Sequence, residues 1–146
     1  MAESTQSSVV VQAAPEAVLD IIADFDGYPE WTQFKSATVV AEDADGWPEQ
    51  VEFVLDAGPI KDTYTLSYDW DVVEDGTGTV SWTLVKASLL KTLDGTYTLT
   101  AEGAGTKVDY QLKVDVSLPM LGVLKRKAES IIIDTALKGL KKRAEA

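Results

Sequence analysis

Aromatic side chains with a polar tip are the residues of this sequence best suited to chemistry, and they recur at every second position of strand-like segments. The set is Tyr64, Tyr68, Trp70, Trp82, Tyr97 and Tyr110. A period of two places them on one face of a sheet, while polar residues such as Thr63 and Asp69 occupy the other face. Each buried hydroxyl or indole N–H needs a hydrogen-bond partner. The pattern is typical of a solid aromatic core or of a mostly apolar cavity with a few convergent donors.

Histidine and cysteine, which most often carry acid–base, nucleophilic and zinc chemistry, are absent from the 146 residues. The composition therefore excludes a Ser-His-Asp triad, a thiol nucleophile, a disulfide framework and typical zinc sites. The 24 acidic residues include no D-x-[DN]-x-[DN]-G loop. The alternation indicates no inward carboxylate, so no metal, cofactor or acid–base pair is predicted. Tyrosine hydroxyls and a positioned water could still polarise a bound carbonyl.

The net charge of −11 argues against nucleic acid and anionic membrane as main partners, because proteins bind both chiefly through Lys and Arg. The charge is uneven, since the segment from Pro119 onward carries seven basic and three acidic residues. A basic helix on an acidic body is expected to be intramolecular complementarity. The basic face at Lys127, Lys138, Lys141 and Lys142 favours the alternative of an interaction module.

The N-terminus has no basic n-region followed by an apolar h-region, and no run approaches the ~18 apolar residues of a membrane span. A cytoplasmic protein without stable membrane insertion is expected, although transient membrane contact stays open. The length suits one domain with a core of its own.

The first elements are a short strand over Ser7–Ala13 and a helix that starts at Ala14-Pro15-Glu16. Apolar residues at Val18, Leu19 and Ile22 give this helix one buried face. The segment from Tyr28 to Trp31 follows as a turn or a short second helix. We expect Pro15 and Trp31 to be structural.

From Lys35 the pattern changes to period two and predicts six consecutive antiparallel strands with one dry face. The turns between them are predicted at 43–46, 58–59, 74–78, 87–90 and 102–105.

A long amphipathic helix is predicted over Pro119–Arg143. Its broad apolar arc needs a concave partner, which only the strands can supply. The predicted fold is therefore α+β: a seven-stranded bent antiparallel sheet wrapped around a long C-terminal helix, with one or two short helices after strand 1.

Residues 14–31, APEAVLDIIADFDGYPEW, resemble the N-terminal motif of the START-like superfamily, in particular its polyketide cyclase/dehydrase and coenzyme-Q-binding-like group. The segments Gly95-x-Tyr97-x-Leu99, Gly105–Val108 and Ala136–Lys141 also resemble it. The resemblance covers essentially the whole chain and implies a single helix-grip domain over residues 1–146. The family includes lipid carriers, sterol and hormone binders, aromatic polyketide cyclases and ribosome-associated proteins, so it leaves the function open.

Pattern and resemblance together predict a small hydrophobic ligand (a lipid, polyketide or isoprenoid-like molecule) in a cavity between the sheet and the C-terminal helix. We expect a carrier or sequestering protein rather than an enzyme. A polyketide cyclase or dehydratase acting through pocket tyrosines is the alternative, and a ribosome-associated module is the third. The predicted lining is Phe53, Tyr64, Tyr68, Trp70, Trp82, Tyr97, Tyr110, Leu124, Ala128, Ile131 and Thr135.

The loops of a meander alternate between the two ends of its sheet, and here one end is acidic and glycine-rich while the other is apolar. Exposed apolar loop tips are unusual without a functional reason. The apolar end is predicted to be the cavity mouth, with Lys125 or Arg126 near an acidic headgroup. The predicted mouth residues are Leu89, Leu90, Met120, Leu121, Lys125 and Arg126. The alternative is that these loops are buried as ordinary core.

Overall fold

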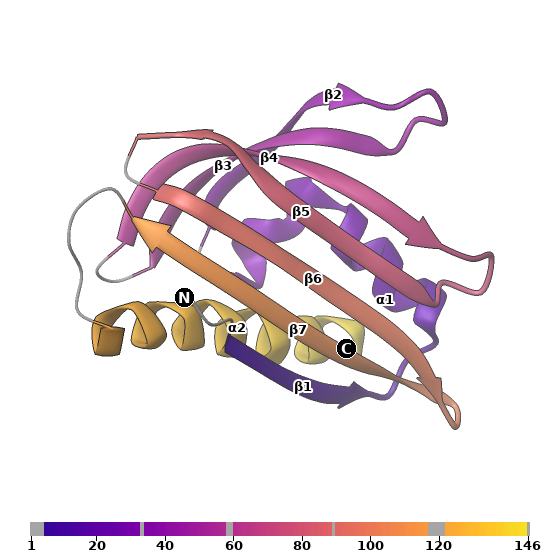
Figure 1. The fold of residues 1–146 in the computed structure, drawn as a ribbon. Coiled ribbons are helices and arrows are strands. Elements are labelled where there is room, and N and C mark those ends of the chain that lie inside the picture. Colours follow the sequence, from indigo (N-terminus) through magenta and orange to yellow (C-terminus); the bar gives the residue numbers. More distant parts are fainter. Residues whose placement is uncertain (1–4, 33, 58–59, 89, 117–121, 146) are drawn as a thin grey trace.

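The computed structural model describes residues 5–32, 34–57, 60–88, 90–116 and 122–145, with the backbone alone described at 57, 60, 116, 122–125 and 128. The elements in chain order are β1 (Thr5–Val11), α1 (Pro15–Ala23), η1 (Phe25–Glu30), β2 (Phe34–Glu42), β3 (Pro48–Ala57), β4 (Ile60–Val72), β5 (Gly78–Ala87), β6 (Leu90–Glu102), β7 (Gly105–Val116) and α2 (Gly122–Ala144). The seven strands form one antiparallel sheet in the order β1-β7-β6-β5-β4-β3-β2 (Figure 1). The predicted α+β helix-grip architecture is confirmed.

The short helices follow from local sequence signals. Pro15 is the first residue of α1, where its missing N–H costs nothing, and the preceding Ala14 is extended. The helix buries Val18, Leu19 and Ile22. The 3₁₀-helix η1 is the short second helix anticipated at Tyr28, whose hydroxyl donates to the Ile22 carbonyl. This bond ties η1 back onto α1.

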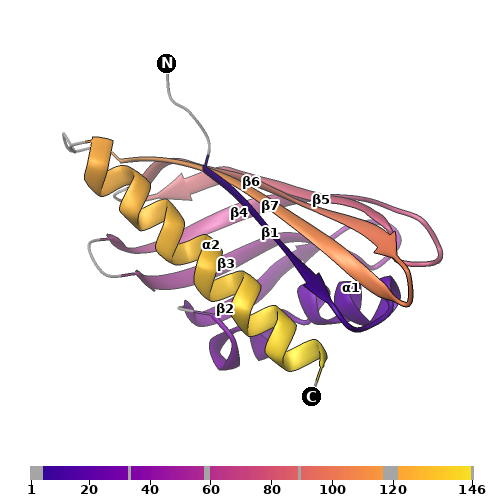
Figure 2. The ribbon, with the colours of Figure 1, turned by 90° about the horizontal axis from the view of Figure 1, so that it is seen from below.

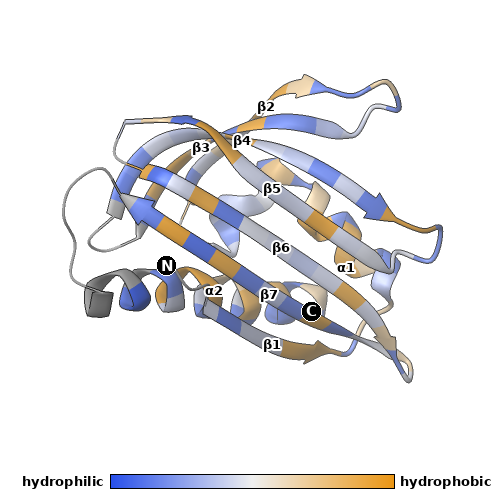
Figure 3. Cartoon of the chain, viewed as in Figure 1, coloured by the Kyte–Doolittle hydropathy of each residue, from blue (hydrophilic) through white to orange (hydrophobic). Residues whose placement is uncertain are grey.

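The sheet is bent, and α2 lies across its concave side beside β1 (Figure 2). Hydrophobic and hydrophilic residues alternate along β6 and β7 (Figure 3). Among the described side chains of α2, the buried ones are Glu129, Ile132, Ile133, Ala136, Leu137 and Leu140. Its solvent side carries Arg126, Lys127, Asp134, Lys138 and Lys142.

The starts of β1 and β6 are among the boundaries that differ from the predictions. The first strand runs over Thr5–Val11 rather than Ser7–Ala13, because Thr5 and Gln6 continue the ladder with β7. Leu90 was assigned to a turn, but it is the first residue of β6 and pairs with Val116. The predicted helix start at Pro119 lies outside the described residues.

Edge strand β1 is covered by side chains from the end of α2. Lys141 was predicted on the open side of the helix, but it is half-buried and its Nζ donates to the Val10 carbonyl at 2.8 Å. The Gln12 N–H donates to the Glu145 carboxylate at 2.7 Å. These bonds occupy main-chain groups that an edge would otherwise expose.

The pairing of β5 with β6 is short. It covers five positions, from Gly78↔Leu99 to Trp82↔Gly95. Both strands continue beyond this ladder, but no pairs join them among the described residues 83–88 and 90–94. Figure 1 shows β5 diverging from β6 toward its C-terminal end. The sheet thus consists of two halves, β1-β7-β6 and β5-β4-β3-β2, and the β5–β6 ladder pairs them only over Gly78–Trp82 of the described residues.

Candidate functional site

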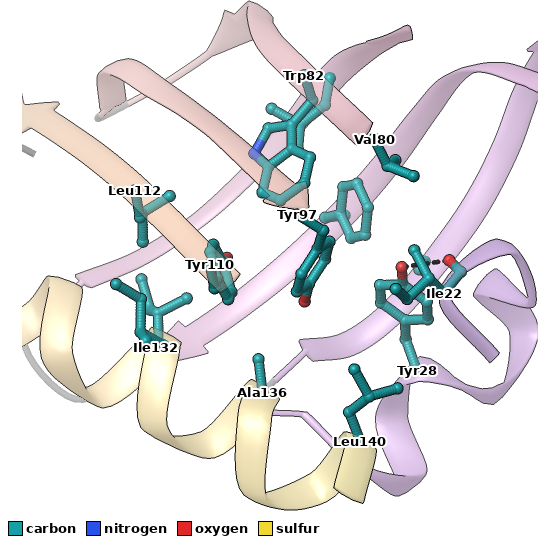
Figure 4. Packing of buried hydrophobic residues seen from close by; sticks show 14 of the residues in the cluster. Ile22, Tyr28, Val80, Trp82, Tyr97, Tyr110, Leu112, Ile132, Ala136 and Leu140 are labelled. Carbon is teal, nitrogen blue, oxygen red and sulfur yellow. Dashed lines mark hydrogen bonds between the residues drawn. The ribbon is translucent and has the colours of Figure 1, made fainter. Parts of the chain in front are cut away.

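The space between the sheet and α2 is occupied by aromatic rings from the middle strands. Trp82 of β5 and Tyr97 of β6 have ring centroids 5.3 Å apart, and Tyr97 lies 4.5 Å from Tyr110 of β7. Figure 4 shows these rings facing Ile132 and Ala136 of α2. The strand alternation aims the rings inward, and the bend of the sheet brings them together.

Among the described side chains lie two small voids of about 20 Å³ each, both bounded by Phe34, Tyr97, Tyr110 and Ile132. Each void has roughly the volume that one water molecule occupies. Binding sites for small molecules usually measure about 300–1,000 Å³. The expectation of a ligand-sized cavity that is already open is therefore not met by these two voids. Aromatic rings that stack between neighbouring strands take up the space.

Five of the predicted lining residues meet around the first void: Tyr64, Tyr68, Trp82, Tyr97 and Tyr110. Phe53 lies outside its lining, with its ring stacked 5.6 Å from Tyr64. Trp70 is also outside, because its ring packs 5.1 Å from Trp47 and its indole N–H donates to the Pro48 carbonyl. The rest of the lining was not among the predicted lining residues: Tyr28, Phe34, Leu66, Leu93, Leu112 and Ile132.

The helical side of the site differs by one position from the prediction. Ile132 and Ala136 bound the voids, whereas the predicted Ile131 and Thr135 are half-buried and do not appear in the described linings. A rotation of 100° per residue separates these neighbouring positions. The apolar arc is too broad to reveal which of its residues faces the centre. The side chains of Leu124 and Ala128 lie outside the described ones.

The structure describes two side chains of the predicted cavity mouth, Leu90 and Arg126. Leu90 is buried with 4% exposure, so its assignment as an exposed loop tip is wrong; β6 starts there and turns the side chain inward. Arg126 is exposed on α2, and its role near an acidic headgroup stays a prediction. Residues Leu89, Met120 and Leu121 and the side chain of Lys125 lie outside the described part.

Two inward carboxylates were missed. Asp62 is in phase with Tyr64 on β4, and its carboxylate accepts the N–H groups of Thr63, Ser88 and Leu90. Glu129 of α2 is fully buried and accepts the Val114 N–H at 2.7 Å and the Thr5 hydroxyl at 2.6 Å. Asp62 lies two residues before the inward-facing Tyr64, so the period of two could have revealed that it faces inward. No such pattern marks Glu129, which lies in a helical segment of mixed polarity. Both carboxylates hold strand ends in place.

Burial governs the electrostatics of the tyrosines. It raises the pKa of the Tyr64, Tyr68 and Tyr97 hydroxyls well above their ordinary value, with a smaller contribution from neighbouring tyrosines. Burial likewise raises the pKa of Tyr110. At neutral pH these groups are protonated, so each is a hydrogen-bond donor and none is a base. The Tyr64 hydroxyl and the Trp31 indole N–H are buried without a hydrogen-bond partner among the described residues.

Alkaline pH is expected to destabilise the protein through these tyrosines. An unfolded tyrosine ionises near pH 10, the reference value for the side chain, while the folded-state pKa values lie higher. The contribution of these tyrosines to stability is therefore fully present below pH 10. It falls as the pH rises further, because the unfolded state loses protons that the folded state retains. We expect tyrosinate absorbance at 295 nm to appear together with loss of the far-UV circular dichroism. Ionisation of all five tyrosines with a native spectrum would contradict this burial.

No group of three or more Asp or Glu side chains that could hold a metal ion occurs in the described part of the chain. Among the helices of that part, none combines the length and the apolar character that crossing a membrane requires.

A family model described as polyketide cyclase/dehydrase and lipid transport matches residues 2–145. No curated protein matches the chain.

Solved structures share the architecture over nearly the full chain. A START superfamily protein from Mycobacterium smegmatis superposes with a TM-score of 0.87 at 22% identity, covering 97% of each chain. A protein from Thermus thermophilus gives 0.80 at 23% identity, again over 97% of each. The Zhui aromatase/cyclase from Streptomyces sp. R1128 gives 0.79 at 14% identity, over 99% of this chain and 94% of that one. At these identities the likeness establishes the fold alone.

Proposed function

This chain belongs to the polyketide cyclase/dehydrase and lipid transport family, and on that premise we propose that it binds a small hydrophobic ligand between the sheet and α2. The ligand is an apolar molecule with one or two hydrogen-bond acceptors, of the lipid, polyketide or isoprenoid-like kind. The protein acts as its carrier or sequesters it from water.

The observation that carries this proposal is the Tyr64 hydroxyl, buried beside an apolar void without a partner among the described residues. A buried polar group without a hydrogen bond costs about 1–3 kcal/mol. A ligand carbonyl or hydroxyl that accepts from Tyr64 removes this cost. Tyr97 and Tyr110 line the same void with neutral hydroxyls, so they offer donors to an acceptor of the ligand.

Binding at the two described voids requires the surrounding rings to move, because voids of about 20 Å³ cannot hold such a ligand. The rings that fill the space are themselves apolar, so a ligand replaces ring–ring contacts with ring–ligand contacts. The change in apolar contact is small, and the new hydrogen bonds favour the bound state. Ligand-free and ligand-bound forms should therefore differ in the positions of Trp82 and Tyr97.

A second candidate function is polyketide cyclisation or dehydration. The row of protonated tyrosines favours it, since donors placed around a carbonyl stabilise the oxyanion that forms on enolisation. An additional base would have to come from a positioned water or the substrate itself, because the inward tyrosines are protonated. Turnover of a poly-β-ketone substrate distinguishes this function from carriage.

Replacing a tyrosine by phenylalanine removes only the hydroxyl, so such variants test whether that hydroxyl binds the ligand. We expect emodin or oleate to quench tryptophan fluorescence at one molecule per chain and to raise the melting temperature by mass action. Tyr64→Phe should weaken emodin binding roughly fivefold, the equivalent of about 1 kcal/mol. The same change should leave the melting temperature of the free protein unchanged or higher, because it removes a buried hydroxyl that no described residue pairs with.

Tyr28→Phe is the matched control for stability, because the Tyr28 hydroxyl already has a partner in the Ile22 carbonyl. This variant should lose about 1 kcal/mol of stability. The proposed function fails if neither emodin nor oleate binds, by fluorescence or by native mass spectrometry.

A further inference from the structure

The gap between β5 and β6 is spanned by a side chain. Beyond Trp82↔Gly95 the Leu84 N–H donates to the Asp94 carboxylate at 3.3 Å. In an ordinary antiparallel ladder a strand carbonyl takes this place. The two sheet halves are therefore held together along this gap far more weakly than other neighbouring strands, such as β4 and β5, which stay paired from Tyr64↔Ala87 to Val72↔Gly78.

A groove of about 390 Å³ lies where this gap begins, over the last ladder pairs Ser81↔Thr96 and Trp82↔Gly95 and beside Thr83 and Asp94. Polar side chains such as Ser81, Thr83 and Lys113 line it together with Trp82 and Gly95. Trp82 also lines the first interior void. The same side chain thus borders both the outside groove and the interior.

The Trp82 ring lies directly against Gly95, where a side chain would normally stand. A Cβ atom built at Gly95 would be 2.7 Å from Cε2 of the indole, which is inside van der Waals contact. Without a Cβ at this position the ring can cover the end of the gap. The indole and the Gly95 backbone therefore form the wall between groove and interior at this point.

Different elements support the two halves of the sheet. The helix α2 packs mainly on β1 and β7, whereas η1 packs on β2. Asp62 fixes the start of β6 to β4 through the N–H groups of Ser88 and Leu90. The halves thus stay connected at both ends of the gap, which can widen in the middle.

We propose that the gap between β5 and β6 is the route by which a hydrophobic ligand with a polar end reaches the interior, with the Trp82 indole as its gate. This inference rests on the ligand binding proposed above. Opening the gap breaks the hydrogen bond between Leu84 and Asp94. It breaks no β5–β6 ladder bond, because the described residues 83–88 and 90–94 are not paired with each other. Opening between fully paired strands would break several hydrogen bonds, each of similar strength. The hydroxyl and charged groups of the groove remain available to the polar end.

A disulfide across the gap tests this route. Thr83 and Asp94 directly follow the last ladder pair, Trp82↔Gly95, so they are the first two positions at which a disulfide would cross the gap. The chain has no cysteine, so the double variant Thr83→Cys/Asp94→Cys can form a single bridge. We expect the oxidised form to take up emodin at least about tenfold more slowly than the same double variant in reductant, measured by stopped-flow tryptophan quenching. The control is Asp71→Cys/Thr79→Cys, a staple across the fully paired β4 and β5, which should change nothing.

A second variant keeps the test independent of disulfide formation. Asp94→Ala removes the bond across the gap and should speed association and dissociation of emodin by a similar factor, roughly fivefold. Asp94→Asn keeps an acceptor for Leu84 and should show the smaller effect. Uptake rates unchanged in both the stapled protein and Asp94→Ala would overturn the route while leaving ligand binding intact. Absence of emodin and oleate binding in the unmodified protein would overturn the proposed function, and the route with it.

Discussion

Replacing Trp31 by alanine is expected to lower the free energy of unfolding by about 3–5 kcal/mol, the cost of a large truncation in a core. The Trp31 side chain is 6% exposed, and its ring lies 4.8 Å from that of Tyr28. It fills the junction between η1 and the C-terminal part of α2, where the Trp31 carbonyl also meets Gly139. Urea denaturation followed by circular dichroism measures the loss.

Two variants separate the packing of Trp31 from other effects. Trp31→Phe keeps most of the ring volume and removes an indole N–H without a partner among the described residues, so it should cost much less than alanine. Trp47→Ala removes a half-buried tryptophan in the turn between β2 and β3 and should cost less as well. An unchanged urea midpoint for Trp31→Ala would show that the junction does not stabilise the fold.

Gly139→Ala is expected to destabilise the protein by about 1–3 kcal/mol, although alanine is the better helix former by about 1 kcal/mol. Gly139 lies inside α2, and its backbone packs directly on that of Trp31. A Cβ at this position would overlap the Trp31 carbonyl oxygen and lie 2.9 Å from the carbonyl carbon. Because the obstacle is backbone rather than a flexible side chain, the helix itself would have to move.

The control for Gly139→Ala is Asp134→Ala, on the exposed side of the same helix. That change should leave stability unchanged or slightly higher, because only helix propensity is altered. Thermal unfolding of both variants measures the difference. A more stable Gly139→Ala variant would mean that α2 sits farther from η1 than in this structure.

Local patterns in the sequence were sufficient to predict the order of the elements and the face that each one buries. Period two along β4, β6 and β7 and the position of Pro15 at the start of α1 depend only on residues close in the chain. Five tyrosines and tryptophans of the candidate site followed from the same alternation. The resemblance to the START-like superfamily added the identity of the fold, which the family match supports.

Only the tertiary structure decided how the interior is filled. The period of two predicted that Trp70 faces inward. It could not predict that Trp70 lies away from the centre of the sheet and packs against Trp47. The broad apolar arc of α2 did not reveal that Ile132 and Ala136, rather than Ile131 and Thr135, bound the voids. The volume left between sheet and helix depends on how the rings of Trp82, Tyr97 and Tyr110 pack, which involves residues far apart in the chain.

The same reason explains the carboxylates and the gap in the sheet. The partners of Glu129 lie on β1 and β7, and those of Asp62 lie near the β5–β6 connection, so neither set of bonds is written in a local pattern. Residues 83–87 and 90–94 have strand-like sequences on both sides of the gap. Whether two such strands pair is determined by the curvature of the whole sheet and by the elements that support its two halves, because a hydrogen-bonded ladder is a contact between strands and not a property of either one.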